Sequence, residues 1–138
     1  MMDPLIMLAS PTLSLDAFGS VAGALTLFFA LLIGHALGDF PLQGEFLATG
    51  KNRHLVTEKG GDLVGGGWFV CLIAHALIHA GLVWALTGSV VLGCTELVLH
   101  AVIDAIRCEG KLGFVADQLL HVACKGGFAV LLFFGLVA

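Results

Sequence analysis

Four pairs of ionisable side chains, each with its two members four residues apart, are the groups in this sequence whose types and spacing could do chemistry. Residues four apart lie one above the other on the same face of a helix, so each pair would present two metal-ligand-type side chains together. The pairs are His35 with Asp39, His75 with His79, His100 with Asp104, and Asp117 with His121. The spacing predicts four helices that each direct one pair toward a shared site.

The segments that carry these pairs are strongly apolar. Of the 138 residues, 59% are apolar and 12% are charged, whereas a soluble domain is about 45–50% apolar and about 25% charged. This composition excludes a disordered chain. Six lysines and arginines in a chain of net charge −4 exclude a nucleic-acid partner. We therefore expect an integral membrane protein whose immediate partner is membrane lipid.

The lengths of the apolar stretches predict how often the chain crosses the membrane. A spanning helix needs about 20 mostly apolar residues. Four stretches meet or approach this length, at about residues 20–40, 68–86, 89–106 and 112–138. We predict an all-α fold: a single domain over residues 1–138, built as an integral membrane bundle of four transmembrane helices. Residues 1–19 would form an interfacial or frayed segment.

The basic residues predict the orientation of this bundle. They lie in the first and third connections between the predicted spans: Lys51, Arg53, Lys59, Arg107 and Lys111. Residues 1–19 and the turn at 87–88 carry no lysine or arginine. By the positive-inside rule, we expect loops 1 and 3 to be cytoplasmic and both termini to lie outside.

Histidines and aspartates gathered from four helices form a nitrogen and oxygen ligand set. Facing helices supply such residues inward in the di-metal carboxylate bundles. Imidazole and carboxylate suit a divalent transition metal such as Zn, Mn or Fe, and so many donors favour two ions over one. The predicted metal ligands are His35, Asp39, His79, His100, Asp104, Asp117 and His121. Glu96 or His75 would act as general base or would orient a ligand.

Two further polar residues lie close to these pairs in the sequence. Gln43 follows Asp39 by one turn and would bind substrate or water at the mouth of the site, unless it is a solvated loop residue. Lys125 follows His121 by one turn and would belong to a proton relay or an anion site. Alternatively, Lys125 snorkels to the membrane surface or forms a salt bridge with Asp117 or His121.

Four motifs in a fixed order carry a resemblance to a known family. They are GHALGDFPLQ (34–43), HALIH (75–79), LHAVIDAIR (99–107) and DQLLH (117–121). Over about residues 25–138, the chain resembles a family of small bacterial and phage inner-membrane proteins catalogued as a domain of unknown function. The resemblance implies the four-span fold and a bacterial inner (cytoplasmic) membrane, and it implies no established activity. A more distant similarity to bacterial membrane-bound metal-dependent hydrolases implies a bound metal.

Three functions are compatible with a polar cluster inside a membrane bundle. The first is a metal-dependent hydrolase of a lipid or phosphoester, in which the metal polarises the scissile group and activates water. The second is a transporter of a divalent cation or of protons, which would need a homo-oligomer because four spans are few. The third is a non-catalytic subunit of a larger membrane assembly, in which hydrogen bonds between His and Asp hold the bundle together. The metal content of the purified protein separates the first function from the third.

Overall fold

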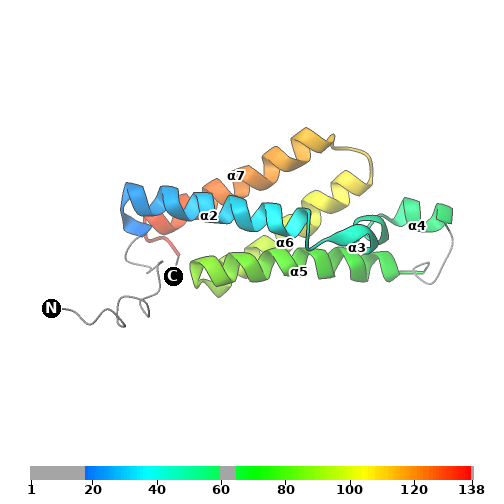
Figure 1. Ribbon diagram of the computed structural model, residues 1–138, viewed down its shortest axis with the longest axis horizontal. Coiled ribbons are helices and arrows are strands. Elements are labelled where there is room, and N and C mark those ends of the chain that lie inside the picture. The colour runs from blue at the N-terminus through cyan, green and yellow to red at the C-terminus, as the bar shows by residue number, and fades with distance from the viewer. Residues whose placement is uncertain (1–17, 60–64, 138) are drawn as a thin grey trace.

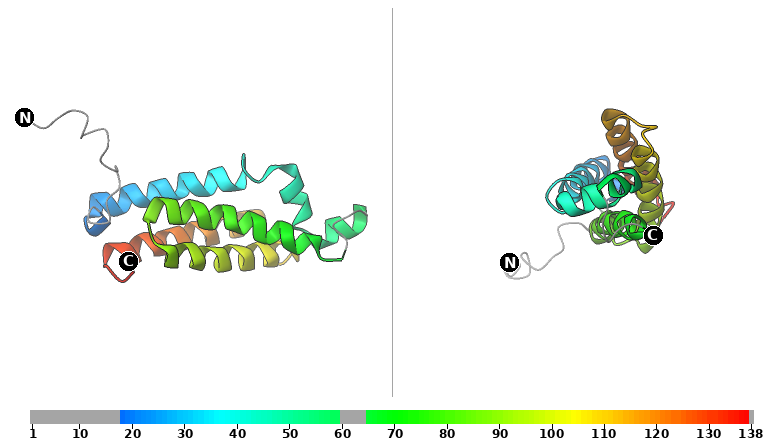
Figure 2. Two further views of the ribbon diagram at one scale, coloured as in Figure 1. Left: turned by 90° about the horizontal axis from the view of Figure 1, so that it is seen from below. Right: turned by 90° about the vertical axis from the view of Figure 1, so that its right-hand side faces the viewer.

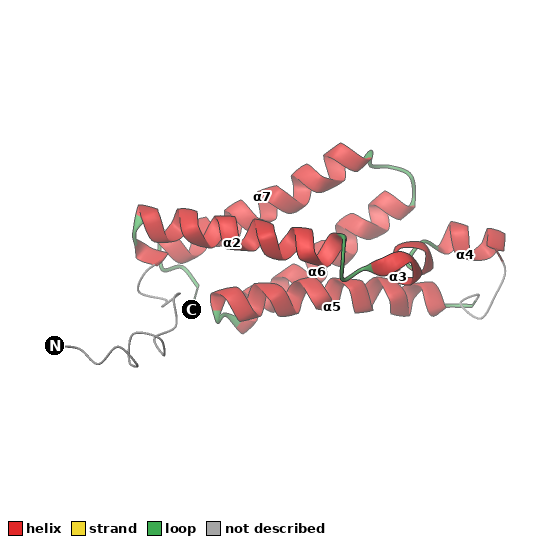
Figure 3. Cartoon of the chain, in the orientation of Figure 1, coloured by secondary structure: helices red, strands yellow, loops and turns green. Residues whose placement is uncertain are grey.

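The computed structural model describes residues 18–59 and 65–137, and this part of the chain is helical and contains no strand (Figure 1). Four long helices lie side by side, and two short helices occupy the connection between the first and second of them (Figure 3). The helices are α2 (Val21–Asp39), α3 (Gly44–Gly50), α4 (Arg53–Lys59), α5 (Gly67–Thr87), α6 (Val90–Cys108) and α7 (Phe114–Phe133). The all-α prediction is confirmed.

Local sequence signals set the ends of the long helices. The Ser20 hydroxyl accepts a hydrogen bond from the Gly23 backbone N–H at 3.0 Å and caps the start of α2. Pro41, which lacks an N–H, lies two residues beyond the end of this helix. Gly88 ends α5 in the left-handed conformation, with a φ of 72°, and Ser89 caps the start of α6. This tight turn makes α5 and α6 an antiparallel hairpin.

The four long helices pack around a common interior (Figure 2). α5 and α6 contact each other along their length, α2 packs against α5 and α7, and α6 packs against α7. The short helix α3 folds back over α5. The inner faces of the long helices therefore converge, and α3 lies at the end of the bundle where α2 ends and α5 begins.

Three of the four long helices, α2, α5 and α7, are long and apolar enough to cross a membrane. The predicted fourth span at residues 89–106 is not among them, so the described part of the chain has three such helices instead of four. α6 has the length of the others, but it contains three charged residues, Glu96, Asp104 and Arg107. Two of these, Glu96 and Asp104, are buried inside the bundle. α6 thus takes its place through packing against α5 and α7, because its composition does not suit lipid on all sides.

The connection between α2 and α5 corresponds to the predicted loop 1. It contains the helices α3 and α4. A salt bridge ties this connection to the other loop at the same end of the bundle. Arg53 of α4 lies 2.7 Å from Glu109, which directly follows α6. The hydrogen bond from Arg53 holds the pKa of the Glu109 carboxyl below its usual range. The polar connection is therefore held against the end of the bundle.

The far half of the bundle interior is apolar. A cluster of buried side chains from all four long helices, together with Phe18 just before α2, fills it: Phe18, Leu27, Leu31, Val83, Leu92, Phe128, Ala129 and Leu132. The predicted interfacial segment, residues 1–19, lies outside the described residues except for Phe18 and Gly19. Because apolar side chains close this half, buried polar groups are concentrated in the half nearer α3.

Gly38 allows α2 and α5 to approach each other beside the polar half. A Cβ atom at this position would overlap the imidazole ring of His79. We expect Gly38→Ala to lower the free energy of unfolding by about 1–3 kcal/mol, because the ring or the helix must move. Denaturant unfolding in detergent micelles measures this change. Gly81→Ala is the control, since a Cβ there meets no atom within 4 Å; equal stability of the two variants would contradict the close approach.

Candidate metal centre

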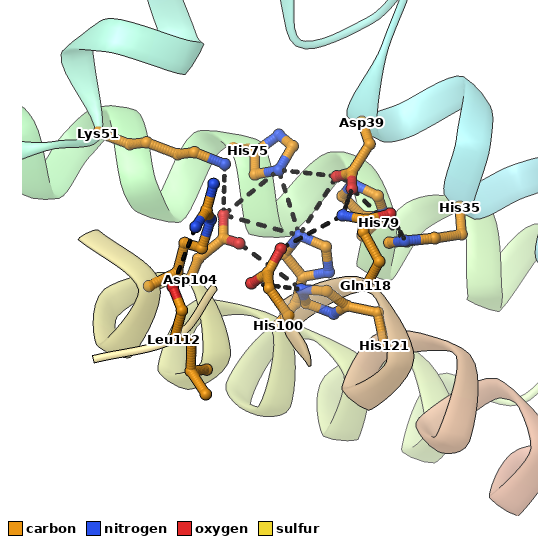
Figure 4. Close-up of polar contacts among 12 residues, drawn as sticks. His35, Asp39, Lys51, His75, His79, His100, Asp104, Leu112, Gln118 and His121 are labelled. Carbon is orange, nitrogen blue, oxygen red and sulfur yellow. Dashed lines mark hydrogen bonds and ion pairs between the residues drawn. The ribbon is translucent and has the colours of Figure 1, made fainter. Parts of the chain in front are cut away.

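Ionisable side chains from all four long helices converge in the half of the bundle nearer α3 (Figure 4). Each helix contributes the pair that helical spacing predicts, and the structure brings all four pairs into one cluster. All members except Asp39 are at most 6% exposed: His35, His75, His79, His100, Asp104, Asp117 and His121. The side chain of Asp39 is 11% exposed. Groups this polar and this buried need compensating partners, because transfer out of water is costly.

Asp39 is at the centre of one part of this cluster. Its Oδ1 atom lies 3.1 Å from His79 Nε2, 3.4 Å from His75 Nε2 and 4.0 Å from His100 Nε2. His75 and His100 face each other through their Nε2 atoms at 3.2 Å. These four residues could hold one metal ion, and we call them the inner site.

The separations within the inner site suit atoms that share a metal ion. In a tetrahedral site with bonds of about 2.0–2.1 Å, neighbouring ligand atoms are about 3.3 Å apart. Asp39 lies 3.1 and 3.4 Å from His79 and His75, and the His75–His100 separation is 3.2 Å. His79 Nε2 is also buried without a hydrogen-bond partner among the described residues. A cation between these atoms would satisfy it.

A second group of ligands, Asp104, Asp117 and His121, lies beside the inner site and could also hold a metal ion. We call it the outer site. His121 Nε2 lies 3.6 Å from Asp104 Oδ1 and 3.7 Å from Asp117 Oδ1. His121 Nε2 and Asp117 Oδ1 are buried and have no hydrogen-bond partner in the described part of the chain. Asp104 Oδ2 lies 3.4 Å from His75 Nε2, which places this carboxylate between the two sites.

The donor chemistry of both sites fits the predicted metal. Each site combines imidazole nitrogens with carboxylate oxygens, and no cysteine belongs to either of these groups of described residues. Such ligands suit Zn, Mn and Fe. Asp104 could bridge two ions, in the manner of two-metal sites whose ions are about 3.5–4 Å apart. Buried His and Asp groups that could hold a metal ion are therefore present, and they come from helices that sequence spacing identified.

Glu96 lies behind His100 on the side away from the inner site. Glu96 Oε1 accepts from His100 Nδ1 at 3.1 Å and from Lys125 Nζ at 2.5 Å. Because Nδ1 of His100 then carries the proton, its Nε2 lone pair is directed at the inner site. These contacts would let Glu96 orient His100 as a metal ligand. They also explain the buried Lys125, which pairs with Glu96 instead of with Asp117 or His121.

His75, the other predicted general base, lies among the ligands of the inner site. Its Nε2 atom is within 3.4 Å of both Asp39 Oδ1 and Asp104 Oδ2. This position makes His75 a ligand candidate equivalent to His79. The predicted ligand His35 lies at the edge of the cluster, where it forms a third group with His100 and His121.

Gln118 is a residue of the site that the sequence reasoning did not single out. Its Nε2 donates to Asp39 Oδ2 at 2.8 Å, and its Oε1 accepts from His35 Nε2 at 3.2 Å (Figure 4). Gln118 therefore holds the Asp39 carboxylate and the His35 ring in fixed orientations. The signal in the sequence that could have identified Gln118 was its position within the DQLLH motif.

Lys51 is the second residue that was missed, because it was assigned to a polar loop. Lys51 Nζ donates to Asp104 Oδ2 at 2.6 Å and to Gln43 Oε1 at 3.4 Å. Folding of the α3 segment over α5 brings this ammonium group onto the outer site (Figure 4). Gln43, the predicted residue at the mouth, thus contacts the site through Lys51.

A cavity of about 440 Å³ opens beside the outer site at the α3 end of the bundle. Its lining is mostly polar and includes carboxylates, two cations and three amides: Asp39, Asp104, Asp117, Lys51, Arg107, Gln43, Asn52 and Gln118. The cavity gives the outer site access from this end, whereas the apolar cluster closes the opposite end.

Comparison with known protein families identifies the family of this chain. The model of the family DUF3307, whose description is "protein of unknown function", matches residues 27–133. The chain belongs to the DUF3307 family. This match confirms the resemblance seen in the four motifs. No curated protein and no solved structure matches the chain. The similarity to membrane-bound hydrolases stays a prediction, and DUF3307 membership assigns no activity to the site.

Proposed function

We propose that this DUF3307 protein is a membrane-embedded metalloprotein with a dinuclear site, and that it hydrolyses a lipid or another phosphoester. One observation carries the proposal: possible ligand atoms from four helices form two adjacent groups, within each of which the atoms lie within 4.8 Å of one another, and members of both groups line a polar cavity. A site that served only to hold the bundle together would have no need of an opening.

The chemistry divides between the bound metals and the residues of the chain. Metals in these sites would polarise the scissile group and make water a better nucleophile at neutral pH. Glu96 accepts from His100 and Lys125 through Oε1 and is not among the residues that line the cavity, so it does not face the space that a substrate can enter. Asp117 lines the cavity with an Oδ1 atom that has no hydrogen-bond partner among the described groups, so this member of the outer site would hold a metal at the edge of the space that a substrate can enter.

The closed end of the bundle supports hydrolysis over transport. Transport needs a polar path across the membrane, in at least one conformation. In the described part of the chain, the buried polar cluster gives way to the Glu96–Lys125 pair and then to apolar side chains such as Phe128 and Leu132. This arrangement favours a site that is reached and left from one side.

The orientation of the site follows from the distribution of basic residues. Lys51, Arg53, Arg107 and Lys111 lie at the end where the cavity opens. By the positive-inside rule, this end faces the cytoplasm and both termini lie outside. We place the protein in the inner membrane of a bacterium, with the cavity at the cytoplasmic surface where lipid headgroups lie.

Elemental analysis of the detergent-purified protein is the first test of this function. We expect about one to two equivalents of Zn, Mn or Fe, and a content below about 0.5 equivalents after incubation with each metal would contradict the proposal. Hydrolysis of p-nitrophenyl phosphate and of short-chain phospholipids is then compared before and after chelation. We expect activity that chelation removes and metal restores. Bound metal together with cation flux in proteoliposomes, and no hydrolysis, would favour a transporter instead.

A further inference from the structure

The cavity beside the outer site contains cationic groups that metal binding alone does not explain. Lys51 and Arg107 line the same space as the carboxylates of Asp104 and Asp117. Lys51 Nζ lies 2.6 Å from Asp104 Oδ2, so an ammonium group already contacts one of the ligands of the outer site. Arg107 donates to the Leu112 carbonyl through Nη1 at 2.9 Å, which occupies one of its five N–H donors.

Charge balance in the cavity depends on the outer site. Without a metal, the three carboxylates that line the cavity, Asp39, Asp104 and Asp117, outnumber its two cations, Lys51 and Arg107, by one charge. A divalent ion in the outer site reverses the sign of this local charge. Lys51 can then donate to a further acceptor from the place it already occupies. An anion bound there would be attracted by the ammonium group and by the metal site together.

The two sites differ in how they could receive a ligand. The inner site has four protein ligands, which is a complete tetrahedral set, whereas the outer site has three. A three-ligand site leaves a coordination position for substrate or water. The cavity borders the outer site through Asp104 and Asp117, and its volume of about 440 Å³ is within the range of small-molecule sites.

The other residues that line the cavity favour phosphate over other anions. They also favour a ligand in which the phosphate is attached to an apolar group. Gln43 and Asn52 add amide donors to those of the two cations, and phosphate oxygens accept several such bonds at once. Phe40 and Phe114 also line the cavity, and both are more than half exposed. A ligand with an anionic head and an apolar remainder matches these two surfaces.

We propose that the cavity binds the phosphate group of a phosphoester between Lys51, Arg107 and the metal-loaded outer site. This inference rests on the proposed function, because the carboxylates alone would repel an anion. Lys51 is the specificity-determining residue, since it lies within hydrogen-bonding distance of an outer-site ligand.

The test uses the full chain in detergent, loaded with Mn²⁺, whose unpaired electrons speed the relaxation of nearby ³¹P nuclei. Mn²⁺ binding is first measured by electron paramagnetic resonance. The ³¹P relaxation of inorganic phosphate and of dioctanoyl phosphatidic acid is then recorded, with dioctanoyl phosphatidylcholine as a hindered diester. Enhancement for inorganic phosphate indicates a site for free phosphate, and enhancement for phosphatidic acid alone indicates a lipid headgroup. Either result supports the proposal.

Variants separate the role of Lys51 from a general effect of charge. We expect Lys51→Met to weaken phosphate binding by about tenfold or more, with an unchanged Mn²⁺ stoichiometry, and Lys51→Arg to restore most of the affinity. Lys111→Met is the matched control: it removes one positive charge from an exposed position at the same end and should bind phosphate like the unaltered protein. Equal phosphate affinity of Lys51→Met and Lys111→Met would overturn the proposal.

The outcomes distinguish this inference from the proposed function. If the protein binds none of Zn, Mn and Fe, both fail. If it binds Mn²⁺ but none of the three phosphorus compounds shows enhanced relaxation, the phosphate site is overturned while the metal site stands.

Discussion

Asp39→Asn is expected to remove the metal of the inner site from the purified protein. The Asp39 carboxylate contacts His79, His75 and His100 through one oxygen and accepts from Gln118 through the other. Asparagine has nearly the same shape but lacks the negative charge that a cation needs. Loss of a residue that only orients a ligand weakens metal binding by 10–100-fold, so we expect a loss of more than about 100-fold for a direct ligand. Elemental analysis and competition with a chelator of known affinity measure it.

Glu109→Gln is the matched control for this substitution. Glu109 lies at the same end of the bundle, but it is exposed and paired with Arg53. Its neutralisation should leave metal content unchanged. Metal binding of Asp39→Asn at the level of the Glu109→Gln control would exclude Asp39 as a ligand. It would then favour a structural role of the aspartate, in a network of hydrogen bonds among the histidines.

The largest effect on stability is expected for Lys125→Met. Lys125 and Glu96 are each only 1% exposed, and Lys125 Nζ lies 2.5 Å from Glu96 Oε1. Removing the lysine leaves the Glu96 carboxylate buried without its counter-charge. Breaking a buried pair in this way costs about 3–5 kcal/mol. Unfolding by sodium dodecyl sulfate in mixed micelles, followed by circular dichroism, measures the change in free energy.

A double variant shows whether the unpaired charge causes the loss. Lys125→Met combined with Glu96→Gln removes both charges and keeps an oxygen that can accept from His100 Nδ1. We expect the double variant to recover most of the lost stability, since a buried pair replaced as a whole is often neutral. Lys111→Met, at an exposed position, should change stability by less than about 0.5 kcal/mol. A single Lys125→Met variant as stable as this control would show that the pair does not carry buried charge.

The buried Glu96–Lys125 pair also links stability to the metal centre. The Oε1 atom of Glu96 accepts hydrogen bonds from both His100 and Lys125. The Glu96 carboxylate therefore fixes the orientation of His100, a candidate ligand, and compensates the charge of the buried Lys125. The pair lies between the His and Asp cluster and the apolar core. It therefore provides a transition from the polar half of the bundle to the apolar half.

Helical spacing was sufficient to predict which faces of the helices carry the site. Residues four apart must lie on one face of a helix, whatever the helix packs against. For this reason His35 with Asp39 and His100 with Asp104 could be paired without knowledge of the fold. The apolar composition likewise determined that α2, α5 and α7 are long and apolar enough to span a membrane. The same reasoning predicted a membrane span at α6, whose charged residues do not fit one. The buried Glu96 and Asp104 of α6 find partners inside the protein.

Contacts between helices were beyond the reach of sequence spacing. The spacing predicted one shared site, but it did not indicate that Asp39 would contact His75 and His79, or that Asp104 would lie between two groups of candidate ligands. The same holds for Lys51, whose ammonium group reaches Asp104 because α3 folds back over α5. Such contacts depend on which helices are neighbours and on how far each helix is shifted along its axis relative to the next. The order of residues along the chain specifies neither.

The sequence by itself therefore determined that the chain is apolar enough for a membrane, where its long helices lie and which residues are candidate ligands. Hydropathy and helical periodicity are local properties, so they can be obtained from the sequence alone. Only the tertiary structure decided how the ligands divide between an inner and an outer site. It alone placed Glu96 behind His100 and Lys51 beside Asp104. The physical reason is that coordination and charge compensation act over about 3–4 Å in space, between groups as far apart in the chain as Lys51 and Asp104.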